Sequence, residues 1–374
     1  MCDIPSVLEV EFNSKRDLAL SLLDDLTAIE STGVKGVSKL KSKIKQELVF
    51  LNKVRDAGNL KKEHLACSNI HHYSALLSYI KQSENCVSLL ETFNFVEEET
   101  GKKKICVDVV SQGKLKWTKV IARNPKALLQ ILKGEGEYLQ KSVMDHASEY
   151  LACAEQNLVL FRPPVVEFHF ACGLEKEVSD VLENIGVQVS GNVIDSENNS
   201  LVPCRTADTL SPDTINKLNL GVTAMVAYVS ALTNGNCHVN LKGKVLSQQA
   251  EWERVRPVKP VLDRYFEGRK LYACKTAVDT FRAIVDAIGG PSEKVRAYEL
   301  LERVCVVDDV PCSTLPVGGQ IKPRSLVIFG TGQAIHAITV TANTSFVRAA
   351  QQQGVRFDVL FHEARALTER KEIH

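Results

Sequence analysis

The sequence predicts an α/β protein that is built from two domains. The chain has 374 residues, which is long for one compact domain. The spacing of its apolar residues is helical over the first sixty positions, and β-rich runs appear only after position 104. Beyond position 218, strand and helix patterns alternate, which favours a mostly parallel sheet covered by helices. We therefore expect a mixed α+β N-terminal domain followed by an α/β domain.

The N-terminal domain is predicted to begin with two antiparallel helices. Apolar residues recur at helical spacing on both sides of Ser31-Thr32-Gly33, a segment that stops the first helix and leaves a short connection. Beyond this pair, apolar, turn-forming and capping residues predict a helix, a β-hairpin, two more helices and a strand–helix–strand unit with parallel strands. The helix is expected at 71–82 and the two strands of the hairpin at 104–110 and 114–122. The next two helices are expected from 125 onward and at 138–153. The strand–helix–strand unit is expected at 165–170, 174–185 and 187–193.

A polar, turn-rich segment separates the two predicted domains. Residues 195–217 contain Pro203, Pro212 and many short polar side chains, and such a run is unusual inside a compact domain. We interpret it as a linker or exposed loop between an N-terminal domain at 1–194 and a second domain at 218–374. In the second domain, strands are expected at 218–221, 304–307, 325–329 and 357–362, and helices at 222–232, 247–266, 277–288, 293–303 and 345–353.

Composition restricts the class of protein. Lys and Arg total 46 against 45 Asp and Glu, so the net charge of +1 gives no global attraction to nucleic acid or membrane. Eleven cysteines without a Cys-x-x-Cys pair, and an N-terminus without a secretory signal, predict reduced thiols in the cytoplasm or nucleus. Residues 218–241 and 325–347 lack charged side chains but contain Asn, Gly and His. We therefore expect no span across a membrane.

Two motifs that would indicate a cofactor are incomplete. Gly330-Thr331-Gly332-Gln333 follows a predicted strand, as a dinucleotide-binding motif does, but the third small position of that motif falls on Ile335. The nine histidines show no metal-ligand spacing, and the side chains of His71 and His72 diverge by about 100° on a helix. The sequence therefore predicts neither a nucleotide nor another cofactor, and no bound metal.

A group of lysines marks the second predicted helix. Five lysines lie between positions 35 and 45, and no acidic residue occurs until Glu47. They flank the apolar stripe of the helix, so they form either a solvated helix edge or a surface for RNA phosphates, with Lys39 and Lys43 as candidates. Trp117 lies on the same strand face as Lys119. It is either a core residue beneath the helical pair or a residue that stacks on an RNA base.

Several segments resemble a eukaryotic family that is named after open reading frame 25 of human chromosome 7. The resemblance covers nearly the whole chain and is most specific in its C-terminal half. The segments that carry it are Lys43–Leu48, Val107–Val110 with Trp117, Gly134–Tyr138, Tyr228–Leu232, Ile328–Gly332, Thr341–Asn343, Phe346–Ala350 and Arg365–Glu369. The C-terminal half of that family is regarded as a PIN-like domain, the fold of many metal-dependent ribonucleases. The resemblance therefore implies a PIN-like fold for residues 218–374.

The resemblance also implies three acidic positions that would hold Mg²⁺ or Mn²⁺. In the family they occur in a Leu-Asp-x-Thr context, in a Cys-Glu-x-Ala-Val context and directly after Gly-Thr-Gly. The matching positions here are Gly221, Lys275 and Gln333, none of which offers a carboxylate. The resemblance thus implies a lost metal site in which Thr223 and Asn343 remain and Lys275 is a candidate phosphate contact.

The sequence predicts a catalytically inactive PIN-like protein that binds RNA or a protein partner. Two alternatives stay open. One is a metal-dependent ribonuclease that uses other acids, such as Asp263, Asp279 and Asp358. The other is a protein scaffold that does not bind RNA. The three hypotheses differ in their dependence on Mn²⁺ and in their affinity for single-stranded RNA.

Overall fold

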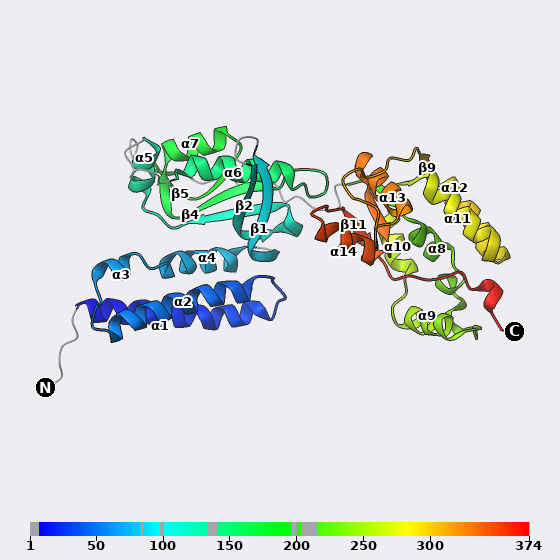
Figure 1. The fold of residues 1–374 in the computed structure, drawn as a ribbon, viewed down its shortest axis with the longest axis horizontal. Helices are drawn as coiled ribbons and strands as arrows, with labels where there is room; N and C mark the ends of the chain where they lie inside the picture. Colours follow the sequence, from blue (N-terminus) through cyan, green and yellow to red (C-terminus); the bar gives the residue numbers. More distant parts are fainter. Residues whose placement is uncertain are drawn as a thin grey trace. The chain divides into compact units, whose positions relative to one another are not determined.

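The structure is a computed structural model, and it describes residues 7–83, 85–97, 101–133, 141–195, 200–202 and 215–373. The chain divides into two compact units, residues 1–211 and 212–374 (Figure 1). Each unit combines a β-sheet with helices, so the predicted two-part α/β architecture is confirmed. Within the described residues, none of the helices is both long enough and apolar enough to cross a membrane.

The N-terminal unit is built on a mixed sheet. Its described strands are β1 (Cys86–Glu97), β2 (Gly101–Ser111), β3 (Lys116–Ile121), β4 (Val165–Glu175), β5 (Gln188–Asp195) and β6 (Ser200–Val202). These six strands follow one another across the sheet in chain order. The pairs β3–β4 and β4–β5 are parallel, and the other neighbours are antiparallel. The predicted β-hairpin and the predicted parallel strand–helix–strand unit are therefore confirmed.

Helices cover both faces of this sheet. They are α1 (Val7–Glu30), α2 (Val37–Asp56), α3 (Lys62–Ala66), α4 (Ile70–Gln82), α5 (Pro125–Leu132), α6 (Val143–Gln156) and α7 (Lys176–Asn184). On one face, α4 packs on β3, and the α1–α2 pair packs on α4 (Figure 1). On the other face, α5, α6 and α7 pack on β4, and α6 also packs on β1. Each face has its own apolar core, and β3 contributes residues to both.

Local sequence explains several helix boundaries. The Asn124 side chain accepts a hydrogen bond from the Lys126 N–H at the start of α5, as expected of an N-cap residue. Ser142 and Asp145 cap the start of α6 reciprocally, so this helix begins at Val143. The predicted start of that helix at 138 lies outside the described residues. The α1–α2 turn requires glycine at Gly36, where φ is +82° and a Cβ atom would lie 2.0 Å from the Leu89 carbonyl oxygen.

The C-terminal unit is built on a parallel sheet. Its described strands are β7 (Lys217–Leu220), β8 (Lys270–Cys274), β9 (Val304–Val307), β10 (Ile338–Thr341) and β11 (Val359–Phe361). These five strands are all parallel, in the order β11-β10-β7-β8-β9. The chain runs outward from β7 to β9 and then returns to the other side of β7. The parallel sheet predicted from β–α alternation is confirmed.

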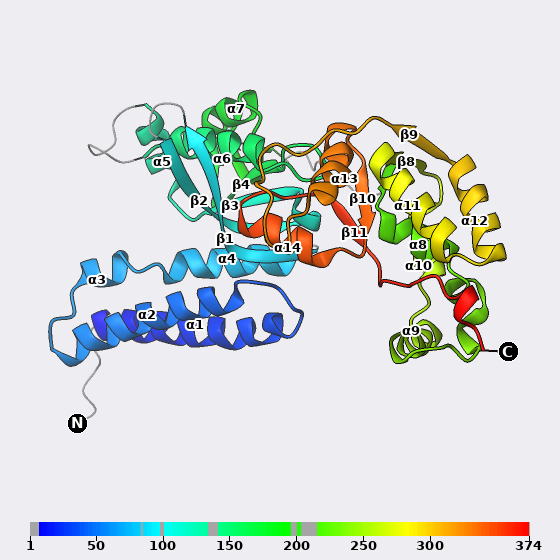
Figure 2. The ribbon, with the colours of Figure 1, turned by 45° about the vertical axis from the view of Figure 1, so that its right-hand side comes forward.

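Helices connect the parallel strands. They are α8 (Val222–Val229), α9 (Lys244–Val255), α10 (Lys259–Phe266), α11 (Lys275–Ile288), α12 (Pro291–Glu302), α13 (Pro323–Ala334) and α14 (Thr344–Gln352). α11 and α12 pack beside α8, and α13 packs on β7, β8 and β10 (Figure 2). The expected connection at 195–217 lies mostly outside the described residues. The described part of it contains β6, which pairs with β5, and the first residue of β7.

Five strand assignments differ from the sequence prediction. The strand predicted at 325–329 is wrong, because these residues belong to helix α13. Most of this helix is buried, so it lacks a polar face, and a short apolar run of this kind fits a buried strand equally well. β1, β6, β8 and β10 were not predicted, and β6 lies in the segment expected to be a linker. β1 is an edge strand with exposed polar residues, and β8 is short and follows a charged turn.

The Gly-Thr-Gly motif lies inside α13, where it permits close packing. A Cβ atom on Gly330 would lie 2.3 Å from the Cys312 backbone nitrogen, and one on Gly332 would lie 2.4 Å from the Thr339 hydroxyl oxygen. Between them, the Thr331 hydroxyl accepts a hydrogen bond of 2.9 Å from the Val310 N–H. The two glycines therefore let the helix approach the sheet on one side and the segment after β9 on the other.

Candidate functional site

The candidate site is the edge at which the parallel strands end. β7 lies between β8 and β10. The chain first adds β8 and β9 on one side of β7 and then β10 and β11 on the other side, so the order of the strands reverses between β7 and β10. Open parallel sheets bind ligands outside the carboxyl ends of the strands at such a reversal. Gly221 follows β7, Lys275 follows β8, and Asn343 lies two residues beyond β10. The fold therefore brings these predicted positions to one edge of the sheet.

Hydroxyl and amide side chains meet at the reversal point. The Thr223 hydroxyl accepts a hydrogen bond of 2.9 Å from the Ala342 N–H and lies 3.4 Å from the Thr341 hydroxyl. The Thr341 hydroxyl accepts one of 3.0 Å from the Asn343 N–H, and the Asn343 amide donates to the Ser325 hydroxyl at 3.4 Å. We call Thr223, Ser325, Thr341 and Asn343 the hydroxyl–amide cluster.

Two members of this cluster were missed in the sequence. Thr223 and Asn343 follow from the family resemblance, whereas Thr341 and Ser325 come from the structure alone. Thr341 ends β10, and its place just before Asn343 is a signal that could have identified it. Ser325 lies in the segment for which the sequence predicts a strand, and as part of α13 it reaches the start of α14.

Gly221 closes the site on the side of β7. Its N–H donates a hydrogen bond of 3.0 Å to the Val340 carbonyl oxygen, which extends the pairing of β7 with β10. A Cβ atom at this position would lie 3.0 Å from that same oxygen and 3.5 Å from the Thr341 hydroxyl. The space that an acidic side chain would need beside β10 is therefore tight.

Lys275 is held by an acid that the sequence analysis did not single out. It begins α11, and its ammonium group forms an ion pair of 2.6 Å with Asp308, directly after β9. The hydrogen bond that Lys275 donates to Asp308 raises the pKa of Lys275, and the negative charges of Asp308, Asp309 and Asp279 add to this effect. Both members of the pair are largely exposed. A phosphate at Lys275 would therefore have to compete with Asp308.

Asp309 is also engaged. Its carboxylate accepts hydrogen bonds from the Thr276 N–H at 3.0 Å and from the Thr276 hydroxyl at 2.6 Å. Burial opposes ionisation of Asp309, but these bonds outweigh it and hold the pKa below its usual value. Asp309 thus ties the segment after β9 to the first turn of α11. In the sequence, Asp308 and Asp309 directly follow the strand predicted at 304–307, and this position is the signal that could have identified them as site residues.

The acids proposed for an alternative metal site do not converge. Asp263 lies on α10 and pairs with Lys259 at 3.1 Å, and Asp279 lies on α11 near Lys275. Asp358 precedes β11, so it lies at the opposite edge, where its carbonyl oxygen accepts from the Thr339 N–H. Across the part of the chain that the structure describes, no group of three or more His, Cys, Asp or Glu side chains is arranged to hold a metal ion.

The structure does not bring Gln333 to this edge. Gln333 is an exposed residue in the last turn of α13, the helix that leads into the start of β10. Two residues further on, the Ile335 carbonyl oxygen accepts a hydrogen bond from Lys217, the first residue of β7. Gln333 therefore lies near the edge where the strands begin, whereas Gly221 and Lys275 lie where they end. The three positions do not form one constellation.

Two sequence families match the chain. Residues 4–214 match a family described as "Family of unknown function (DUF5614)", and residues 218–374 match one described as "Protein of unknown function (DUF1308)". The first match covers more than half of the chain. The chain belongs to the DUF5614 family. In this DUF5614 protein, the edge described above lies in the segment that matches DUF1308. The remaining predicted site residues, Lys39, Lys43 and Trp117, lie in the DUF5614 segment.

Trp117 is a core residue of the DUF5614 segment. Its side chain is fully buried, and its ring centroid lies 4.0 Å from that of Phe93. It belongs to the core beneath α5, α6 and α7, and the α1–α2 pair packs on the opposite face of the sheet. The position expected beneath the helical pair is therefore wrong, and the buried ring offers no surface on which an RNA base could stack.

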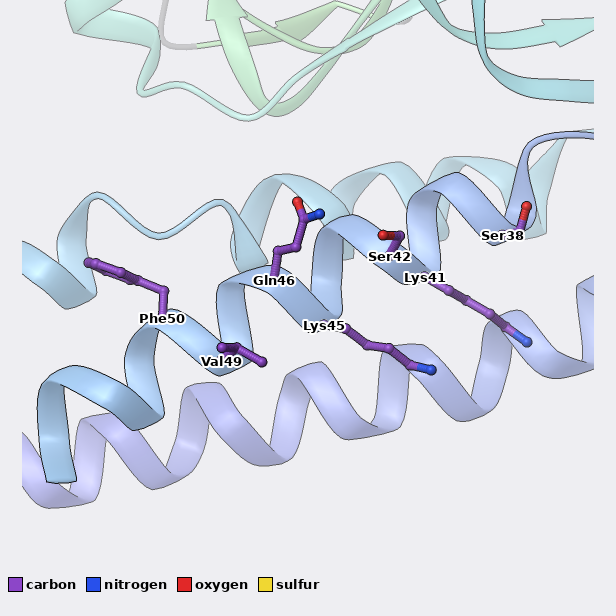
Figure 3. Close-up of a pocket in the computed structure, with 7 residues that line it drawn as sticks. All are labelled: Ser38, Lys41, Ser42, Lys45, Gln46, Val49 and Phe50. Atoms are coloured by element: carbon purple, nitrogen blue, oxygen red, sulfur yellow. The ribbon is translucent and has the colours of Figure 1, made fainter.

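The lysines of the DUF5614 segment lie on more than one side of α2. Lys39 and Lys43 lie near β2, where their charges oppose the rise in the pKa of the Cys106 thiol that burial causes. Lys41 and Lys45 line a surface depression of about 580 Å³ beside the helix (Figure 3). Lys41 is already paired with Glu30 at the end of α1, at 2.5 Å. The four lysines therefore do not form one continuous surface, and the choice between a solvated helix edge and an RNA-binding surface stays a prediction.

Proposed function

We propose that the C-terminal unit of this DUF5614 protein is a PIN-like domain that binds single-stranded RNA without cleaving it. The proposal includes the resemblance to the family named after open reading frame 25 of human chromosome 7. The observation that carries it is the hydroxyl–amide cluster at the reversal point between β7 and β10. Neutral hydrogen-bonding groups stand there where a nuclease would need carboxylates.

The acids at this edge argue against hydrolysis. A metal-dependent ribonuclease needs carboxylates that hold the ions, because the ions activate the attacking water and stabilise the leaving oxygen. The acids that directly follow β9 are engaged by Lys275 and Thr276. After β11, Glu363 pairs with Arg256 at 2.6 Å. Each of these carboxylates already has a cation or hydrogen-bond donor as its partner, so none is set up as a ligand for a divalent ion.

The same edge favours an anion. α8, α13 and α14 all begin there, and the first turn of a helix offers free backbone N–H groups and the positive end of the helix dipole. Ser325 connects α13 to Asn343, the N-cap residue of α14. Lys322, the N-cap residue of α13, and Arg324, in its first turn, are exposed next to Ser325 in the sequence. We therefore select Lys322 and Arg324 as candidate phosphate contacts near the hydroxyl–amide cluster.

Reversing both charges, with Lys322→Glu and Arg324→Glu together, is expected to weaken binding of a single-stranded RNA oligonucleotide. Each lost phosphate contact should reduce the magnitude of the slope of log affinity against log salt by about 0.7. The double variant, which lacks two contacts, should therefore show a slope about 1.4 smaller in magnitude. Fluorescence anisotropy at several salt concentrations measures both quantities. The matched control is Lys270→Glu with Arg303→Glu, because these exposed residues lie where β8 and β9 begin.

The two double variants separate the possible outcomes. Loss of affinity in the first variant but not in the control supports an RNA site at the edge where the strands end. An equal loss in both would indicate nonspecific attraction, and the proposed site would be wrong. No RNA binding by the wild-type protein would favour the scaffold hypothesis.

Manganese is expected to leave the stability of the C-terminal unit unchanged. A ligand that binds only the folded protein raises the free energy of unfolding by RT ln(1 + [L]/Kd), so a genuine site would give a saturable rise in Tm. Calorimetry with increasing Mn²⁺, with Ca²⁺ as a control for nonspecific effects, measures this rise. A saturable increase with Mn²⁺, together with Mn²⁺-dependent RNA cleavage, would establish the nuclease alternative instead.

A further inference from the structure

The N-terminal unit contains a large groove beside α4. Its volume is about 1230 Å³, and it lies between α4, the segment that directly follows β3, and residues within the parallel strands β4 and β5. One wall is a stripe of small side chains on α4, formed by Ser74, Ala75 and Ser78. Asn124, which caps α5, and Asn192, within β5, line the groove from the other elements.

The groove exists because one face of β4 and β5 is polar. Along β4, Phe168 and Phe170 belong to the core beneath α5, α6 and α7, so the alternating residues Glu167 and His169 face the side of α4. On β5, the Ser190 side chain hydrogen-bonds the His169 ring, at 2.9 Å. The helices on this side pack over β1 and β3, so a polar part of the sheet beside α4 faces the groove.

A hydrogen-bonded network supports the floor of the groove. The Tyr79 hydroxyl donates to the Glu167 carboxylate, which also accepts from Thr118 at 2.9 Å and pairs with Lys116 at 3.1 Å. Burial opposes ionisation of Glu167, but the bond from Tyr79 and the charge of Lys116 outweigh it and lower its pKa. The rings of Tyr79 and His169 stand 4.7 Å apart. Two aromatic rings are thus held in place at the groove.

We propose that this groove binds an unpaired nucleobase. Unpaired bases are recognised by rings that stack on them and by groups that hydrogen-bond their edges. Tyr79 and His169 provide the rings, and Gln82, Asn124 and Asn192 provide amides, each of which carries both donors and acceptors. The ligand class rests on the RNA binding proposed above, but the groove lies in the other unit of the chain.

The charge of the groove selects against other ligands. The side chains that line it are neutral amides, hydroxyls, aromatic rings, a thiol and small apolar groups. Burial lowers the pKa of His169, so this ring is uncharged at neutral pH. Glu167, below the floor, is compensated by Lys116. An uncharged heterocycle with a hydrogen-bonding edge suits such a surface, because the residues that line the groove include no Lys, Arg, Asp or Glu.

Cys172 provides a direct test in the unmodified 374-residue chain. It is exposed and lines the groove, whereas Cys305, on β9 of the other unit, is exposed elsewhere. The rate of alkylation by iodoacetamide is measured for each cysteine by mass spectrometry. The rate without a ligand is compared with the rate in the presence of adenosine, guanosine, cytidine or uridine, and ribose 5-phosphate serves as the control that lacks a base. At about three times its Kd, a nucleoside that occupies the groove should slow alkylation of Cys172 about fourfold. Cys305 should react at an unchanged rate.

Two variants test the location of the site. Ser78→Trp fills the groove from α4, and it should abolish the protection of Cys172. Ser148→Trp is the matched control, because Ser148 is an exposed residue of α6, on the opposite face of the sheet, and protection should remain. His169→Ala should weaken nucleoside binding by about fivefold to a hundredfold, the usual effect of losing a stacking ring. Circular dichroism confirms that each variant is folded.

Several results would overturn the inference. They are the absence of protection by all four nucleosides, equal protection by ribose 5-phosphate, and protection that survives Ser78→Trp. These outcomes are distinct from failure of the proposed RNA site, because free nucleosides report on the groove alone. The Lys322 and Arg324 variants report on the edge of the parallel sheet alone. Nucleoside binding without RNA binding would retain the groove and remove the proposed function.

Discussion

Replacement of Arg365 by alanine is expected to lower the free energy of unfolding of the C-terminal unit by about 3–5 kcal/mol. The Arg365 side chain is fully buried, and it donates to the Glu253 carboxylate at 2.7 Å and to the Arg256 carbonyl oxygen at 3.1 Å. Its loss leaves the Glu253 carboxylate buried, with a hydrogen bond of 2.9 Å from the Val258 N–H but without its cation. Urea unfolding followed by circular dichroism measures the change.

Two further variants define the cause of this effect. Arg264→Ala removes an exposed arginine from α10, and it should change stability by less than about 0.5 kcal/mol. Replacing both partners, with Arg365→Met and Glu253→Met, should recover much of the loss, because well-packed apolar residues can substitute for a buried ion pair. If Arg365→Ala is no more destabilising than Arg264→Ala, the buried pair does not support the fold.

Alanine at Gly330 or Gly332 is expected to destabilise the C-terminal unit by about 1–3 kcal/mol or more, because each added methyl group overpacks the core. At Gly332 it would collide with Thr339 and with Asn219, a buried residue of the central strand. At Gly330 it would meet the backbone of residues 310–312, which cannot move aside as a side chain does. Thermal unfolding and near-ultraviolet circular dichroism measure stability and packing.

Gly318→Ala is the matched control for these variants. Its added Cβ atom would meet no atom within 4 Å, and its backbone conformation is open to other residues. The change should be neutral or stabilise the fold by up to about 1 kcal/mol, because alanine restricts the unfolded chain. Equal stability of all three variants would show that α13 does not depend on close approach. The Gly-Thr-Gly motif would then need another explanation.

The sequence predicted most elements whose pattern is local. The α1–α2 pair, α5 with its Asn124 cap and β9 were predicted because apolar spacing and capping residues act over a few positions. α13 was not predicted, because its local pattern is ambiguous. A helix buried on most sides has no polar face, so its spacing does not distinguish it from a buried strand. The environment of α13 is set by residues far away in the chain.

The candidate site was predicted only in part. Thr223 and Asn343 were identified through the family resemblance, but their partners Thr341 and Ser325 depend on strand order and on the path of α13. Gln333 was grouped with Gly221 and Lys275 because it follows Gly-Thr-Gly, whereas the structure places it near the opposite edge. The pair formed by Lys275 and Asp308 joins two strand ends that are separated by more than thirty residues.

Residue types and their spacing were enough to predict the fold class and the parallel pairing expected from β–α alternation, and they show directly that Gly221, Lys275 and Gln333, which the family resemblance singles out, are not acids. These properties depend on residue type and on spacing along the chain. The tertiary structure alone decided which face of the sheet holds Trp117, which acid neutralises Lys275, and where the polar groove beside α4 opens. Such properties arise from packing between distant segments, because each apolar face must be buried against another element, and the sequence does not name that partner.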